Sequence, residues 1–109
     1  MSLIFWYLIC GHALCDYPLQ GDFLARGKNN LNPIPGIPWY QCLMAHSLIH
    51  AGMVTIITSN VYLGFAEFIA HCVIDYGKCN NKYGFNEDQI FHVICKLAWV
   101  IILLWAQQQ

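Results

Sequence analysis

Four long apolar segments follow one another along the chain, separated by short stretches rich in polar residues, glycine or proline. Segments of this length and composition predict helices. Pro18 interrupts the first segment, Pro38 suits the first turn of the second, and Asn86 is a suitable N-cap for the fourth. The predicted helices are residues 2–19, 38–58, about 61–77 and about 86–105.

The connections between these segments predict how the helices are arranged. Residues 32–38 (NPIPGIP) cannot form a regular helix, so we expect a Pro/Gly/Asn-rich loop after helix 1, preceded by a short amphipathic piece over 20–28. Ser59 and Asn60 predict a tight turn, and residues 77–84 predict a polar loop. The fold class expected for the single domain 1–109 is therefore all-α, a four-helix up-down transmembrane bundle.

Histidine and aspartate recur at a spacing of four residues, which places both side chains of a pair on one helix face. The four pairs are His12/Asp16, His46/His50, His71/Asp75 and Asp88/His92. They contain all five histidines and three of the four aspartates. Helices 1 and 3 carry their pairs near their ends, and helices 2 and 4 carry theirs near their starts. Because consecutive helices alternate in direction, all four pairs are predicted to meet at one end of the bundle.

The composition favours a membrane protein. Charged residues make up 10% of the chain, against about 25% in soluble globular proteins, and hydrophobic residues make up 58%. A net charge of −1 with scattered basic residues excludes a nucleic-acid surface. The six cysteines form no CxxC motif and are expected to be buried free thiols. No secretory signal is evident at the N-terminus. A soluble bundle is the alternative.

Imidazole and carboxylate together are ligands for divalent ions such as Zn, Mn or Fe. The eight paired residues exceed what one tetrahedral ion needs, so one or two ions fit, with two ions bridged by an aspartate. The alternatives are hydrogen-bonded core histidines and a proton or ion pathway. The predicted metal ligands are His12, Asp16, His46, His50, His71, Asp75, Asp88 and His92.

Further polar residues continue the same helix faces. Glu67 and Lys96 should reach similar depth on helices 3 and 4, and they predict an intramembrane ion pair beneath the site. General-base catalysis by Glu67 is the functional alternative. At the outer rim, Gln20, Lys28 and Lys78 are candidates for binding a phosphate or carboxylate. The simpler interpretation of both lysines is that they are solvated and set the orientation in the membrane.

Four ordered motifs carry a resemblance to a known family: GHALCDYPLQ (11–20) followed by Lys28, HSLIH (46–50), HCVIDYGK (71–78) and DQIFH (88–92). Together they resemble the small bacterial and phage membrane proteins grouped as domain of unknown function 3307. The resemblance spans nearly the whole chain and implies a polytopic membrane protein, expected in a bacterial inner membrane. The matching positions are His12, Asp16, Gln20, Lys28, His46, His50, His71, Asp75, Lys78, Asp88, Gln89 and His92.

The function expected from these residues is a metal-dependent hydrolase of a phosphoester or lipid-linked substrate. Basic residues in the loops at the site end, namely Arg26, Lys28, Lys78 and Lys82, predict that this end faces the cytoplasm. The alternatives are a metal-ion or proton transporter and a metal-stabilised structural or host-envelope interaction protein. The expected partners are the lipid bilayer and the substrate, and a homo-oligomer stays open.

Overall fold

Helices account for nearly all of the regular structure in the computed structural model, which describes residues 2–108. No strand occurs within this range, so the all-α prediction is confirmed. The described part of the chain has one more helix than predicted, because the short piece after helix 1 is a helix of its own. The helices are α1 (Ser2–Asp16), α2 (Gly21–Gly27), α3 (Trp39–Thr58), α4 (Val61–Cys79) and α5 (Phe85–Gln107).

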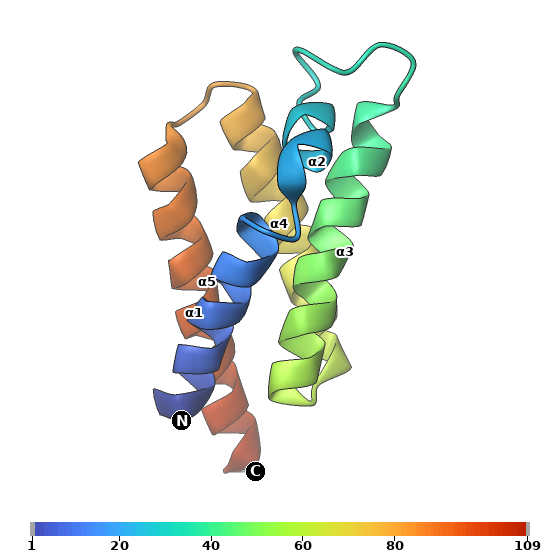
Figure 1. The fold of residues 1–109 in the computed structure, drawn as a ribbon. Helices are drawn as coiled ribbons and strands as arrows, with labels where there is room; N and C mark the ends of the chain where they lie inside the picture. Colours follow the sequence, from blue (N-terminus) through green and yellow to red (C-terminus); the bar gives the residue numbers. More distant parts are fainter. Residues whose placement is uncertain (1, 109) are drawn as a thin grey trace.

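The four long helices pack around a common axis in an up-down arrangement (Figure 1). Helices α1 and α4 run toward the end that carries the 28–38 and 80–84 connections, and α3 and α5 run away from it. Each long helix contacts two others, in the order α1, α3, α4, α5 and back to α1. The short α2 lies beyond the end of α1 and packs against α3.

Two predicted helix boundaries need correction. Helix α1 ends at Asp16, because a turn over 17–20 and the positive φ of Gly21 (65°) redirect the chain into α2. The predicted N-cap Asn86 lies inside α5, whose N-cap is Gly84. The side chain of Glu87 accepts the backbone N–H of Gly84 at 3.1 Å and so satisfies the start of that helix. The α3 prediction matches Trp39–Thr58, with Pro38 as its N-cap.

Helices α3 and α4 approach closely because a glycine faces the contact. A Cβ atom added to Gly64 would lie 2.9 Å from the Ala51 carbonyl oxygen and would clash with the Thr55 hydroxyl. Beyond this contact, toward the end where α1 begins and α5 ends, the interior contains a cluster of buried apolar side chains. Its buried members are Leu8, Val54, Leu63, Trp99, Val100 and Leu103. The polar residues of the predicted site therefore lie on one side of this apolar cluster.

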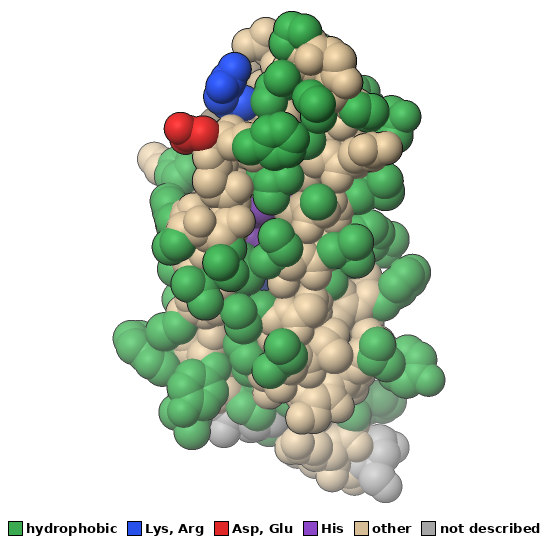
Figure 2. Space-filling model, turned by 45° about the vertical axis from the view of Figure 1, so that its right-hand side comes forward, with side chains coloured by type: hydrophobic (Ala, Val, Ile, Leu, Met, Phe, Trp, Pro, Cys, Tyr) green, Lys and Arg blue, Asp and Glu red, His purple; other side chains and the backbone are tan. Residues whose placement is uncertain are grey.

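The outer surface of the long helices is apolar. Figure 2 shows hydrophobic side chains distributed along the whole visible face, with the charged side chains close to the end that carries α2. Large apolar residues such as Trp6, Ile56, Phe65 and Trp105 are more than half exposed. Two helices, α3 and α5, are long and apolar enough to cross a membrane, with mean hydropathies of 1.3 and 1.9. Length and composition thus give weak evidence for membrane association.

Candidate metal centre

All four predicted pairs come together in one buried cluster between α1, α3, α4 and α5. The centre of each of the five imidazole rings lies within 6.4 Å of the centre of another. The His71 ring is stacked between the rings of His50 and His92, at centre-to-centre distances of 3.8 and 4.2 Å. His46, His71 and His92 have no exposed surface. His46 and His92 each lie two turns inside their helices, about 10 Å from the helix start at 1.5 Å per residue. The pairs meet toward one end of the bundle, beneath α2.

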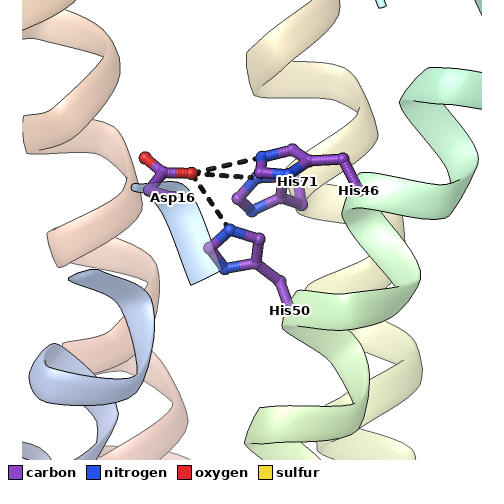
Figure 3. A group of neighbouring side chains, drawn as sticks. All are labelled: Asp16, His46, His50 and His71. Carbon is purple, nitrogen blue, oxygen red and sulfur yellow. Dashed lines mark hydrogen bonds and ion pairs between the residues drawn. The ribbon is translucent and has the colours of Figure 1, made fainter. Parts of the chain in front are cut away.

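Three histidines and one aspartate point their ligand atoms at a common position (Figure 3). The Oδ1 atom of Asp16 lies 3.0 Å from Nε2 of His50, 3.2 Å from Nε2 of His46 and 4.0 Å from Nε2 of His71. Ligands about 2.0–2.2 Å from a tetrahedral ion are about 3.3–3.6 Å from one another. The 3.0 Å contact is a hydrogen bond from His50 to Asp16, whose proton a bound ion would displace, and the four ligand atoms lie within 4.8 Å of one another, so they could hold an ion.

The protonation of His71 fits a ligand role. Its Nδ1 donates to Oε2 of Glu67 at 2.9 Å, because a carboxylate only accepts, and in the neutral ring Nε2 then carries the lone pair. A carboxylate behind a histidine is the usual support for a metal ligand. Nε2 of His71 and both ring nitrogens of His46 are buried without a hydrogen-bond partner. Such orphaned atoms are rare in folded proteins and call for a ligand.

The predicted ion pair between Glu67 and Lys96 is confirmed. Nζ of Lys96 donates to Oε1 of Glu67 at 2.8 Å, and both side chains are at most 1% exposed. The indole Nε1 of Trp99 donates to the same oxygen at 2.9 Å, a contact that the sequence did not reveal. Both Glu67 oxygens thus have partners, which suits a residue that orients His71. General-base catalysis by Glu67 stays a prediction.

A second set of possible metal ligands lies next to the first. We call Asp16, His46, His50 and His71 the first donor group, and Asp75, Asp88 and His92 the second donor group. Nε2 of His92 donates a hydrogen bond to Oδ1 of Asp75 at 3.0 Å and lies 3.5 Å from Oδ1 of Asp88. The other Asp75 oxygen, Oδ2, lies 3.4 Å from Nε2 of both His46 and His71. Asp75 therefore faces both groups, one with each oxygen, and Oδ2 also accepts a hydrogen bond from Lys28.

His12 is the one predicted ligand that lies outside these donor groups. Its Nε2 is 3.0 Å from Oε1 of Gln89, and an amide oxygen accepts, so that nitrogen carries the proton. The amide nitrogen of Gln89 donates to Oδ2 of Asp16 at 2.9 Å and to Oδ2 of Asp88 at 3.1 Å. Gln89 matched the family motifs, but residue spacing alone gave it no place in the site.

The three predicted rim residues lie in different surroundings. Lys28, the C-cap of α2, is 7% exposed and donates to Oδ2 of Asp75 at 2.8 Å, so the interpretation of Lys28 as a solvated lysine is wrong. Gln20 donates to the main-chain oxygen of Asp16 at 3.0 Å. Lys78 lies in the last turn of α4 with its Nζ 6.0 Å from the Phe85 ring centre. Only Lys28 among them contacts a donor-group side chain.

Two contacts fix α2 and the α4–α5 turn around the cluster. A Cβ atom on Gly27 would lie 2.5 Å from Sγ of Cys42, so glycine lets the end of α2 lie against α3. This position brings Lys28 over Asp75. On the other side, the Tyr83 hydroxyl donates to the Ile74 carbonyl. Burial, followed by the nearby Asp88 carboxylate, raises the pKa of Tyr83, so it stays a donor.

The cluster contains more carboxylates than ammonium groups. Four carboxylates (Asp16, Glu67, Asp75 and Asp88) face two ammonium groups (Lys28 and Lys96), which leaves a formal charge of −2 with neutral imidazoles. Uncompensated charge in a buried place is costly. One divalent cation would neutralise the cluster.

The comparisons with known proteins identify a family. A family model described as "Protein of unknown function (DUF3307)" matches residues 4–109. No curated protein and no solved structure matches the chain. Because the model matches the chain over nearly its full length, this protein belongs to the DUF3307 family.

Proposed function

We propose that this protein is an integral membrane hydrolase that binds a divalent metal ion and cleaves a phosphoester or lipid-linked substrate at the cytoplasmic leaflet. The observation that carries the proposal is the convergence of His46, His50, His71 and Asp16, in which ring nitrogens of His46 and His71 are buried without a hydrogen-bond partner. When bound, such an ion activates water and stabilises negative charge on a phosphoryl oxygen. Zn, Mn and Fe all accept this ligand set.

The membrane location rests on the surface of the bundle. Helices α3 and α5 meet the length and hydropathy of a span. Helix α4 has 19 residues, and the charged residues in its interior, Glu67 and Asp75, are buried and paired, so they do not meet lipid. Helix α1 has only 15 residues, about 22 Å at 1.5 Å per residue, and α2 extends the same column. In this proposal α3, α4, α5 and the combined length of α1 and α2 each cross the bilayer.

The chain's own residues would bind and orient the substrate. Lys28 places an ammonium group next to the donor atoms, where it can pair with an anionic substrate oxygen. Gln89 holds one oxygen of Asp16 and leaves the other facing the imidazoles. Glu67 holds His71 in the tautomer with its lone pair toward the centre. The other rim candidates, Gln20 and Lys78, lie on the same side and would contact the substrate only outside the donor groups.

A polar cluster that is closed off by apolar residues toward one end of the bundle favours hydrolysis over transport. Below the imidazoles, the Glu67–Lys96 pair and the apolar cluster around Leu8, Val54 and Leu63 occupy the interior. These described residues offer no row of polar groups that continues to the opposite end. A transporter would need such groups along its path. The basic residues Arg26, Lys78 and Lys82 near the α2 end support the cytoplasmic orientation.

The test is phosphate release by the purified protein in nanodiscs. The metal-loaded protein is given a phospholipid phosphomonoester and an isoprenoid phosphate, with His50→Ala as the site variant and Asp22→Asn, an exposed position, as the control. We expect release by the wild type and by Asp22→Asn, and at least a hundredfold loss in His50→Ala. Metal-loaded wild type without release from either substrate would contradict the hydrolase. Metal flux into liposomes that depends on His50 would instead identify a transporter.

A further inference from the structure

We infer that the centre holds a second divalent ion at Asp75, Asp88 and His92, bound together with a phosphate-type oxyanion. This inference rests on the proposed function and extends it to two ions and to a dianionic phosphoryl group as the substrate class. The three donor atoms are Oδ1 of Asp75, Oδ1 of Asp88 and Nε2 of His92, and all three residues are at most 4% exposed.

An orphaned anionic oxygen points to a ligand at this place. Oδ1 of Asp88 is buried and has no hydrogen-bond partner, although it lies 3.5 Å from Nε2 of His92. A buried carboxylate oxygen without a donor loses its hydration and gains nothing in exchange. Nε2 of His92 donates a hydrogen bond to Oδ1 of Asp75 at 3.0 Å, and a divalent ion bound among Oδ1 of Asp75, Oδ1 of Asp88 and Nε2 of His92 would displace that proton.

The side-chain amide of Gln89 determines which oxygens of Asp16 and Asp88 face the two donor groups. The two N–H bonds of the Gln89 amide are used by Oδ2 of Asp16 and Oδ2 of Asp88, at 2.9 and 3.1 Å. Each aspartate therefore turns its Oδ1 away from Gln89, Asp16 toward the first donor group and Asp88 toward the second. Gln89 thus acts as a positioning residue shared by both groups, a usual role for the supporting contacts of metal ligands.

Asp75 connects the groups. Its Oδ2 lies 3.4 Å from Nε2 of His46 and of His71, and its Oδ1 lies 3.0 Å from Nε2 of His92. A carboxylate in this position would be shared by two bound ions, and such a pair would supply stabilisation of the attacking and leaving oxygens in phosphoryl transfer. The third acidic neighbour, Glu67, is already paired with Lys96, Trp99 and His71 and is not needed as a ligand.

The formal charge of the cluster predicts which anion would bind together with the second ion. The formal charge of −2 becomes 0 with one divalent ion and +2 with two, while the imidazoles stay neutral. A dianionic phosphate would compensate the second ion, and Lys28 lies beside the bridging Asp75 to contact the same anion. The second ion should therefore bind weakly alone and more tightly with phosphate.

The experiment is a Mn²⁺ titration of the purified protein in detergent, followed by elemental analysis and electron paramagnetic resonance, with and without inorganic phosphate. We expect two equivalents, an exchange-coupled spectrum of the pair, and at least tenfold tighter binding of the second equivalent with phosphate. Asp88→Asn keeps the shape and a Gln89 acceptor, and should bind one uncoupled Mn²⁺. The control Asp22→Asn should bind two.

The possible failures are distinguishable. A single equivalent in the wild type that His50→Ala removes would overturn the second site and leave the proposed first site intact. No bound Mn²⁺ would overturn both. Two equivalents in Asp88→Asn, or a second affinity that phosphate does not change, would also overturn the inference. The wild-type spectrum decides the ion count without any variant, so misfolding of Asp88→Asn cannot hide the result.

Discussion

Replacing Lys96 with methionine tests whether the buried ion pair supports the centre. Lys96 and Glu67 are separated by 2.8 Å and are at most 1% exposed. At an effective dielectric constant of about 20, two unit charges at this distance attract by about 6 kcal/mol. Desolvation offsets much of this attraction, but removal of one partner leaves a buried charge alone, which costs about 3–5 kcal/mol. Glu67 keeps its bonds to His71 and Trp99, so we expect about 3 kcal/mol for Lys96→Met.

The assay is reversible unfolding of the metal-free protein in mixed micelles with increasing SDS, followed by circular dichroism. The double variant Glu67→Gln/Lys96→Met removes both charges and should lose only about 1 kcal/mol, because no buried charge is left unpaired. The exposed Lys82→Met is the control and should change stability by less than about 0.5 kcal/mol. A loss below about 1 kcal/mol for Lys96→Met, or a double variant less stable than the single one, would refute the reasoning.

Three further predictions concern metal binding and packing. His50→Ala should lose the first ion while His12→Gln keeps it, because His12 lies outside the donor groups; equal metal loss in both, by elemental analysis, would contradict this placement. Lys28→Met should tighten Zn²⁺ binding about tenfold in a competition assay with a fluorescent chelator, about 1.4 kcal/mol, because Lys28 places a positive charge 2.8 Å from Oδ2 of Asp75; unchanged or weaker binding would count against a competing ammonium group. Gly64→Ala should cost about 1–3 kcal/mol through its clash with Thr55, whereas Gly52→Ala, where a Cβ has nothing within 4 Å, should be neutral or stabilise by up to about 1 kcal/mol; SDS unfolding that shows equal effects would refute the packing of α3 on α4.

Helix positions and the meeting of the four pairs could be predicted because both depend on local rules. A spacing of four residues fixes the face, and alternating helix direction fixes the end, so His12 and His92 come within one cluster although they are far apart in sequence. The Glu67–Lys96 pair followed from the same register. These features need no knowledge of how α2 or the side chains pack.

The positions of Lys28 and Gln89 could not be predicted from spacing, because each depends on tertiary packing. Lys28 reaches Asp75 only because Gly27 lets α2 lie against Cys42 of α3. Gln89 follows Asp88 directly, and consecutive helical residues point about 100° apart. Since α5 packs between α4 and α1, Asp88 and His92 face α4 while Gln89 faces α1 and meets Asp16. Lys78 lies three residues after Asp75 on the same helix, but its ammonium group lies 6.0 Å from the ring centre of Phe85 in α5.

The most direct test of the metal centre is the metal content of the protein purified without chelator. We predict at least one equivalent of a divalent transition metal per chain in the wild type, and loss of that metal in the double variant His46→Ala/His50→Ala. Asp22→Asn should retain the wild-type content. Less than about half an equivalent in the wild type, or an unchanged content in the double variant, would contradict the assignment of the cluster as a metal centre.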